Sequence, residues 1–311
     1  CMVYVERSTP YAGVRRGLVA AIDLEAYSFE EGAKTPIKAS EGTVLSRIPP
    51  RVERRKKAPL ELPHIMILID DEERTVIEPL ASERLEPLYD TKLNMGGGSV
   101  KGYKVADCGP VIERFKKLAD PGFISKKYGR AENMAMAVGD GNHSLATAKA
   151  IWEQIKPYLS EEERKSHPAR FALAEIVNIY DEGVHFHPIH RVFFLKDGKH
   201  FTEGLKRHLK GYPGKGEIIF SGKREELPLP QGAAEAVSAV QEYADAYIKE
   251  HGGEVDYIHG EDAMLEICEK QGAVGVLLPS ISKQSFFGYI IEHGSFPRKT
   301  FSIGEACEKR Y

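Results

Sequence analysis

The sequence lacks the patterns that identify several common classes of protein. Its four cysteines, Cys1, Cys108, Cys268 and Cys307, show no C-x-x-C spacing, which is typical of isolated thiols in a reducing cytoplasm. No apolar run reaches the roughly 20 residues of a membrane-spanning helix, and the first residues do not resemble a signal peptide. Serine-hydrolase, zinc-protease, Walker and Rossmann fingerprints are also absent. We therefore expect a cytoplasmic protein with no membrane partner.

Charge of one sign is also scarce. The formal net charge of −3 provides no global positive field for nucleic acid or a membrane surface. No helix-turn-helix with a basic face is visible, so a nucleic-acid partner is not expected. The 311 residues, 42% hydrophobic and 29% charged, suit one large or two medium-sized soluble domains. Because a strand-like run follows Cys1 directly, we expect residues to precede it in the natural protein.

Strand-like runs and helical periodicities alternate irregularly, which predicts an α+β or mixed α/β fold. Predicted strands include residues 2–7, 17–22, 64–70, 134–139, 216–220, 275–278 and 287–291. Predicted helices are residues 110–118, 144–158, 202–209, 233–250 and 261–270. Residues 29–63, rich in charge and proline, are predicted as a long polar loop. We expect a main domain at 1–210, and at 211–311 a C-terminal portion that packs on the same site without being an independent domain.

The sequence GDGNHS at residues 139–144 ends a buried strand and begins a helix. Glycines permit positive φ or close backbone approach, and the first N–H groups of a helix are a ready anion site. Asp140 suits a Mg²⁺ carried by a phosphate, or a hydroxyl to be deprotonated. His143 can donate to a phosphoryl oxygen or carry a proton. The alternative is a helix cap with a tight turn, which accounts for one polar residue here but not for four. The predicted phosphate-binding residues of this turn are Gly139, Gly141, Asn142 and Ser144.

Three other polar groups follow turn-forming residues. Glu41, Thr43 and Arg51 lie in the long polar loop, where a solvated loop is the alternative. His190 and Arg191 follow Pro188, which we expect to break a strand, and arginine binds carboxylate or phosphate in two-pronged fashion. The third group is Lys299 and Thr300 in "FPRKTF", which taken alone is an ordinary basic turn.

The chain resembles the domain-of-unknown-function family 1015 over essentially its whole length. The segments that carry this resemblance include "YVERSTP", "EGTVLSRIPPR", "GDGNHSLATAKA", "HPIHRV" and "FPRKTFSIGEA". Relatives look like D-G-H-H-R at the glycine loop, H-E-x-T with a later arginine, T-H-R, and P-x-K-S/T near the end. The residues that match are Glu41, Thr43, Arg51, Asp140, Gly141, His143, His190, Arg191, Lys299 and Thr300. Ser144 departs, because many relatives carry arginine there. If that arginine binds phosphate, another cation stands in here, and Arg51 and Lys299 are the candidates.

The glycine loop is also similar to one in the ParB/sulfiredoxin group, which includes partition proteins, sulfiredoxin and free serine kinases. In that group the loop and its helix hold nucleotide phosphates. This second resemblance covers one loop only. It implies a ParB/sulfiredoxin-like nucleotide-binding core with additional strands and helices.

The combined prediction is a nucleotide-dependent phosphotransferase that acts on a small polar metabolite, such as free serine, with Mg²⁺ and ATP or ADP. Glu41, Asp140 and His143 are its predicted catalytic residues, with Asp140 as the Mg²⁺ ligand. Thr43 and Arg51 are predicted to bind phosphate with the helix N-terminus. His190, Arg191, Lys299 and Thr300 are predicted to bind the substrate, and all these groups are expected to line one pocket. The alternative is a nucleotide- or phosphometabolite-binding module without turnover.

Overall fold

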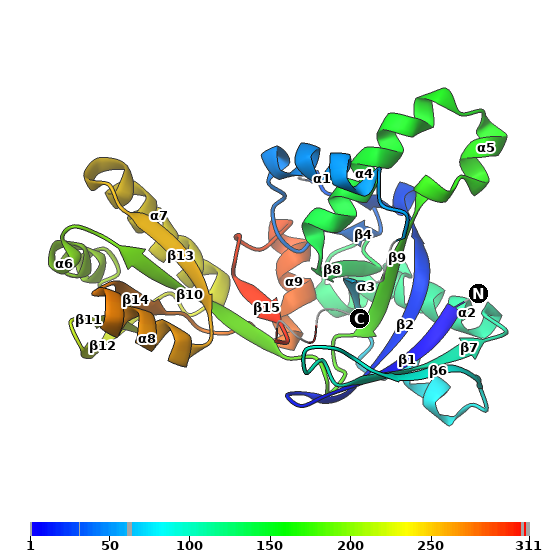
Figure 1. The fold of residues 1–311 in the computed structure, drawn as a ribbon, viewed down its shortest axis with the longest axis horizontal. Helices are drawn as coiled ribbons and strands as arrows, with labels where there is room; N and C mark the ends of the chain where they lie inside the picture. The colour runs from blue at the N-terminus through cyan, green and yellow to red at the C-terminus, as the bar shows by residue number, and fades with distance from the viewer. Residues whose placement is uncertain (1, 31, 61–63, 306–307, 309–311) are drawn as a thin grey trace. The chain divides into compact units, whose positions relative to one another are not determined.

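The computed structural model describes residues 2–30, 32–60, 64–305 and 308. The chain forms two compact units, one of residues 1–185, 286–295 and 303–311, the other of residues 186–285 and 296–302. Each unit combines a β-sheet with helices (Figure 1), so the predicted mixed α/β fold is confirmed. The expected main domain at 1–210 and the C-terminal portion at 211–311 stay a prediction.

The first unit is built on a mixed sheet, which has nine strands within the described residues, in the order β3-β4-β8-β5-β9-β2-β1-β7-β6. The interior strand β5 (Ile65–Ile69) is buried at every residue, as expected of an apolar run without polar alternation. β5 runs antiparallel to β8 (Met136–Asp140) and parallel to β9 (Phe171–Asn178). The remaining strands are β1 (Met2–Thr9), β2 (Gly13–Asp23), β3 (Tyr27–Ser28), β4 (Ile37–Lys38), β6 (Glu86–Lys92) and β7 (Ser99–Val105).

Helix α4 (Asn142–Ile155) follows β8 after a single glycine and packs against β3, β5 and β9. Leu145 and Trp152, seven residues apart on one helix face, are fully buried in the core of the sheet. Full burial of one such side chain contributes about 1.5–3 kcal/mol. The other helices with most of their residues in this unit are α1 (Ile48–Arg55), α2 (Gly109–Leu118), α3 (Pro121–Tyr128), α5 (Glu161–Ser166) and α9 (Lys283–His293).

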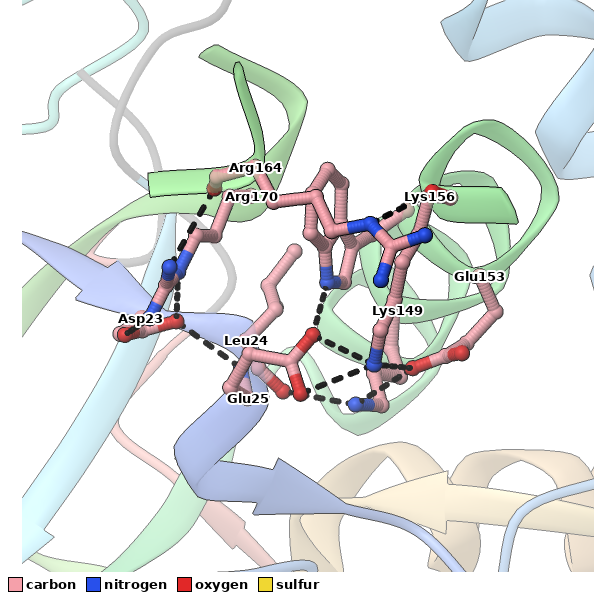
Figure 2. Close-up of polar contacts among 9 residues, drawn as sticks. Asp23, Leu24, Glu25, Lys149, Glu153, Lys156, Arg164 and Arg170 are labelled. Atoms are coloured by element: carbon pink, nitrogen blue, oxygen red, sulfur yellow. Dashed lines mark hydrogen bonds and ion pairs between the residues drawn. The ribbon is translucent and has the colours of Figure 1, made fainter. Parts of the chain in front are cut away.

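The second half of α4 is tied to the turn after β2 by the polar contacts in Figure 2. Trp152 Nε1 donates to Glu25 Oε1 at 2.5 Å, and the ammonium of Lys156 lies 2.7 Å from the same oxygen. Arg170 donates to both carboxylate oxygens of Asp23, at 2.9 and 2.6 Å. Burial acts to raise the pKa of Asp23, but these bonds outweigh it and hold the pKa below its ordinary value. Since partly exposed ion pairs contribute little stability, this network chiefly orients α4.

Residues 29–63, predicted as a polar loop, contain a helix, so that prediction is wrong. Pro49 and Pro50 occupy the first turn of α1, where a missing N–H removes no helical hydrogen bond. Ile48 and Val52, one turn apart, pack against Ala146 and Ile151. These two are the buried residues of the helix. Because charged residues surround them in the sequence, no helical periodicity was visible there. Residues 61–63 of the predicted loop lie outside the described residues.

The run 287–291, predicted as a strand, belongs to helix α9. Its buried residues Phe286, Phe287, Ile290 and Ile291 are spaced as neighbours on one helix face. A short apolar run does not by itself distinguish a strand from a buried helix. The prediction was therefore wrong in type, although it identified a core segment.

The second unit contains a sheet in the order β12-β11-β14-β10-β13, with β15 also paired to β10. Pro188 does not break β10 (Phe186–Phe194), contrary to expectation, because it precedes the stretch from Ile189 onward that pairs with β13. The other strands are β11 (Gly214–Phe220), β12 (Lys223–Leu229), β13 (Glu254–His259), β14 (Val274–Leu277) and β15 (Phe301–Ile303). The helices are α6 (Gly198–His208), α7 (Ala233–His251) and α8 (Glu261–Gln271).

Phe193, Phe201 and Val237 lie in the core of this unit, where helices α6 and α7 contact each other.

Among the described residues of the whole chain, no helix combines the length and the hydrophobicity needed to span a membrane.

Candidate functional site

The turn between β8 and α4 is shaped by two glycines. Gly141 has φ of +87°, and a Cβ there would lie 3.2 Å from the Cα of Ile65. A Cβ on Gly139 would lie 2.8 Å from Leu68. The glycines therefore allow the chain to turn tightly against β5 and start the helix at once. Asp140 follows the strand, and its Oδ1 accepts the N–H of Gly141 at 2.7 Å.

Gly141 occupies the N-cap position of α4, so the N-cap residue has no side chain that could cap the helix. Asp140 Oδ1 accepts the N–H of Gly141, and Asn142 directs its side chain to Ser40. The functional interpretation of these polar residues stays a prediction. Part of the predicted anion site is engaged within the helix, however. The N–H groups of Ser144 and Leu145 donate to the Gly141 carbonyl at 2.8 and 3.0 Å, so the first-turn donors ahead of this ladder are those of residues 142 and 143.

A segment about 100 residues earlier in the sequence meets this turn. Asn142 Oδ1 accepts the N–H of Ser40, and Asn142 Nδ2 donates to Ser40 Oγ, both at 3.1 Å. His143 Nε2 accepts the N–H of Val44 at 3.2 Å, which assigns the imidazole proton to Nδ1 when the ring is neutral. These bonds fix residues 40–44, called here the 40–44 segment, against the start of α4. Glu41 and Thr43 lie between the two contact points.

A cavity of about 790 Å³ opens on the 40–44 segment, and its lining includes Glu41 and Thr43. The hydroxyl of Thr43 is buried and makes no hydrogen bond to any described residue. Lys38 and Glu132 form an ion pair of 2.6 Å in the wall, with side chains that are 12% and 15% exposed. Lys34 and Arg130 add further cations to the lining. A cavity of this size with charges of both signs is large enough for a small polar ligand.

Helix α1 carries a further set of cations beside α4 (Figure 1). The predicted phosphate ligand Arg51 is exposed on this helix. Arg55, one turn later, is half-buried and donates through Nη1 to the Oγ of Ser144 at 3.1 Å. His64 Nε2 lies 2.8 Å from the same hydroxyl. Arg55 and His64 were missed from sequence, because their contacts with Ser144 form only when the end of α1 and the start of β5 lie beside α4.

The predicted substrate residues lie in the second unit and make a different kind of contact. The Arg191 guanidinium, fully buried, donates to the carbonyls of Ile189, Lys299 and Arg298 at 2.5, 2.6 and 3.2 Å. The Thr300 hydroxyl donates to the carbonyl of Pro297 at 2.6 Å. Lys299 is exposed and has φ of +60°.

His190 Nδ1 accepts the N–H of Leu278 at 3.1 Å. Burial lowers the pKa of His190 to about 4, so the imidazole is neutral at pH 7. His190, Arg191, Lys299 and Thr300 are thus brought together within their own unit, where the contacts of Arg191 and Thr300 shape the 296–300 loop. A substrate-binding role for them stays a prediction.

Comparison with solved structures shows which proteins have a similar fold. The structure matches a free serine kinase variant in complex with AMP at a TM-score of 0.50 and 12% identity, covering 96% of this chain and 90% of that one. A conserved hypothetical protein from Pyrococcus furiosus matches at a TM-score of 0.46 and 13% identity, covering 93% and 91%. The expected likeness to the free serine kinase fold is thereby confirmed.

The family model described as "Protein of unknown function (DUF1015)" matches residues 1–283, and the chain belongs to this family. A search of curated proteins finds no match to it.

Proposed function

We propose that the first unit is a nucleotide-dependent phosphotransferase that transfers a phosphoryl group to the hydroxyl of a small polar metabolite, such as free serine. One observation carries the proposal: the 40–44 segment bonds to the first turn of α4 through Asn142 and His143, and also lines the cavity through Glu41 and Thr43. A helix start that favours anions is thus joined to a carboxylate-bearing cavity wall. The likeness to the free serine kinase fold agrees with this proposal.

In the proposed site, the N–H groups of residues 142 and 143 bind nucleotide phosphate oxygens, and Gly139 and Gly141 allow the tight turn that presents these groups. His143, with its proton on Nδ1, donates to a phosphoryl oxygen. Thr43, whose hydroxyl finds no partner among the described residues, donates to phosphate or substrate. Arg51, exposed on α1, neutralises phosphate charge when the nucleotide is bound.

The carboxylate of Asp140 fits a Mg²⁺ ion, which proteins bind through one or two carboxylates together with substrate phosphates. Mg²⁺ would neutralise charge on the phosphates. Glu41 acts as the general base and accepts the proton of the substrate hydroxyl. As the new oxygen–phosphorus bond forms, the bond from that phosphorus to the bridging oxygen of the nucleotide breaks, so ATP leaves as ADP, or ADP as AMP. Positioning and charge neutralisation supply most of the rate enhancement.

The test is ³¹P NMR of the protein with MgCl₂, ATP or ADP, and a panel of hydroxyl-bearing metabolites that includes serine. We expect a new phosphomonoester signal with one acceptor. Glu41→Gln should abolish this signal while nucleotide binding, followed by calorimetry, persists. Glu53→Gln, an exposed change on α1, is the matched control and should retain activity. Nucleotide binding without any product would favour the binding-module alternative, and the absence of both would overturn the proposal.

A further inference from the structure

The wall of the cavity in the first unit contains an ion pair whose polar atoms are only partly used. Lys38 Nζ donates to Glu132 Oε1 at 2.6 Å, and both mostly buried side chains line the cavity of about 790 Å³. Among the described residues, neither side chain has a second polar partner. An ammonium has three donors and a carboxylate has two acceptor oxygens. Two donors of Lys38 and the second oxygen of Glu132 therefore remain for a ligand.

The two partners are carried by backbone that is fixed before any ligand binds. Lys38 ends β4, which pairs in parallel with β8. Glu132 lies in the segment that leads into β8, where Asn133 Nδ2 donates to the carbonyl of Lys34 at 3.0 Å. This bond ties the segment of Glu132 to the segment that precedes β4. Little conformational freedom is thus lost when a ligand binds to the pair.

Stability alone does not explain a mostly buried ion pair, because the loss of hydration offsets most of the attraction between the charges. The other charged residues of the described lining are of both signs: Lys34 and Arg130 against Glu30, Glu41 and Glu292. A purely anionic ligand would be repelled by these carboxylates, and a purely cationic ligand by the lysine and arginine side chains. A ligand that carries one charge of each sign matches this lining.

We infer that the Lys38–Glu132 pair binds the head group of an α-amino acid, with the ligand carboxylate on Lys38 and the ligand ammonium on Glu132. In an α-amino acid both charged groups are attached to one carbon, so they lie close together, as the two charges of the ion pair do. The four charges then alternate in sign around a closed ring, and each gains a charge-assisted hydrogen bond.

The inference rests on the proposed function for the fate of the ligand, whose hydroxyl is phosphorylated beside Glu41 in the same cavity. It narrows the substrate class to hydroxy amino acids and excludes sugars, polyols and nucleosides, which lack the paired charges. Lys38 and Glu132 are then the residues that determine specificity for this class.

The first test compares ligands. Calorimetry measures the affinity of the full chain for L-serine, L-threonine and L-homoserine. The tightest binder is then compared with two analogues, the amino alcohol that lacks the carboxylate and the hydroxy acid that lacks the ammonium. We expect each analogue to bind about 10- to 100-fold more weakly, through the loss of charge-assisted hydrogen bonds. Equal affinities for the amino acid and its analogues would overturn the inference, as would a protein that binds none of the three amino acids.

The second test assigns the two charges. Lys38→Met should lower the affinity for the amino acid to that for the amino alcohol, and Glu132→Gln should lower it to that for the hydroxy acid. Because a lone buried charge can unfold the protein, Lys38→Met/Glu132→Met replaces the pair by two apolar side chains. This double variant should keep its melting temperature within a few degrees and bind the amino acid no better than either analogue.

The matched control is Lys165→Met/Glu162→Met, at an exposed ion pair of 3.0 Å on α5, which should keep the discrimination among the three ligands. The competing explanation is a purely structural pair that links β4 to the segment before β8. It predicts a lower melting temperature for the double variant and unchanged ratios among the three affinities, and this result would overturn the inference.

Calorimetry with ATP and with inorganic tripolyphosphate separates this inference from the proposed function. Discrimination that depends on Lys38 and Glu132, in a protein that binds neither phosphate compound, would support the inference and count against a phosphotransferase. Phosphoryl transfer to a hydroxyl compound, without discrimination between the amino acid and its analogues, would leave the enzyme in place and overturn the inference. The double variant should bind tripolyphosphate within about 2-fold of the unmodified protein, since the pair is not assigned to phosphate.

Discussion

The start of α4 and the 296–300 loop are both polar turns, yet their hydrogen bonds run to different partners. At α4, side chains of Asn142 and His143 bond to another segment, which lines a cavity. Next to the loop, Arg191 donates to backbone carbonyls and, through Nε, to the side chain of Gln241, and the hydroxyl of Thr300 donates to a backbone carbonyl. Buried carbonyls need such donors, so the fold can require a buried arginine without any ligand. The comparison shows that a polar motif indicates a ligand-binding site only when a cavity lies next to the residues that it contacts.

The largest expected effect is on turnover at α4, from Asp140→Asn. The amide keeps an oxygen that can accept the N–H of Gly141, as the carboxylate of Asp140 does in the structure. If the carboxylate holds Mg²⁺, turnover and Mg²⁺-dependent nucleotide affinity should fall by about two orders of magnitude or more. The melting temperature should stay nearly constant. Calorimetry with ATP, with and without Mg²⁺, checks this, and an unchanged Mg²⁺ response would reduce the motif to a turn.

The next effect is on stability, from Arg191→Met in the second unit. The change leaves the carbonyls of Ile189, Arg298 and Lys299 without their buried donor. The expected cost is about 3 kcal/mol of unfolding free energy, measured by urea denaturation. Arg298→Met, an exposed change in the same loop, should cost little. A normal unfolding curve for Arg191→Met together with a raised KM for the acceptor would instead favour the predicted substrate-binding role.

These two regions also show which predictions the sequence supports. The turn at 139–144 was predictable because its causes are local: an apolar strand, glycines that permit positive φ, and an alanine-rich helix. The work of Arg191 was not predictable, because the carbonyls of residues 298 and 299 lie about 100 positions away in sequence. Arg55 was missed for a related reason, since α1 itself was taken for a loop. The local sequence thus predicted the turn at 139–144, whereas the contacts that depend on packing between distant segments were not predictable.

A pH effect of intermediate size is expected from His190. Its pKa is lowered from 6.5 to about 4 by burial, so the unfolded chain binds more protons between these values. Stability is therefore full above pH 6.5 and declines as the pH falls toward 4, by at most about 3 kcal/mol. His190→Gln keeps an acceptor for the N–H of Leu278 and removes the titration. The variant should show a flatter loss of stability over this pH window in urea denaturation, and equal slopes for the two proteins would contradict the assignment.

The smallest expected effect is on stability, from alanine substitutions at Gly141 and at its control Gly129, which have φ of +87° and +69°. A Cβ at Gly129 meets no atom within 4 Å, so Gly129→Ala reports the cost of left-handed backbone alone, about 1 kcal/mol. Alanine at Gly141 adds a contact of 3.2 Å with the Cα of Ile65, so Gly141→Ala should cost more, about 2 kcal/mol. Because a shifted helix start would also move the N–H groups of residues 142 and 143, its tripolyphosphate affinity should fall several-fold, while that of Gly129→Ala stays unchanged. Equal affinities for the two variants would mean that phosphate binds elsewhere, and would remove the distinction between α4 and the 296–300 loop.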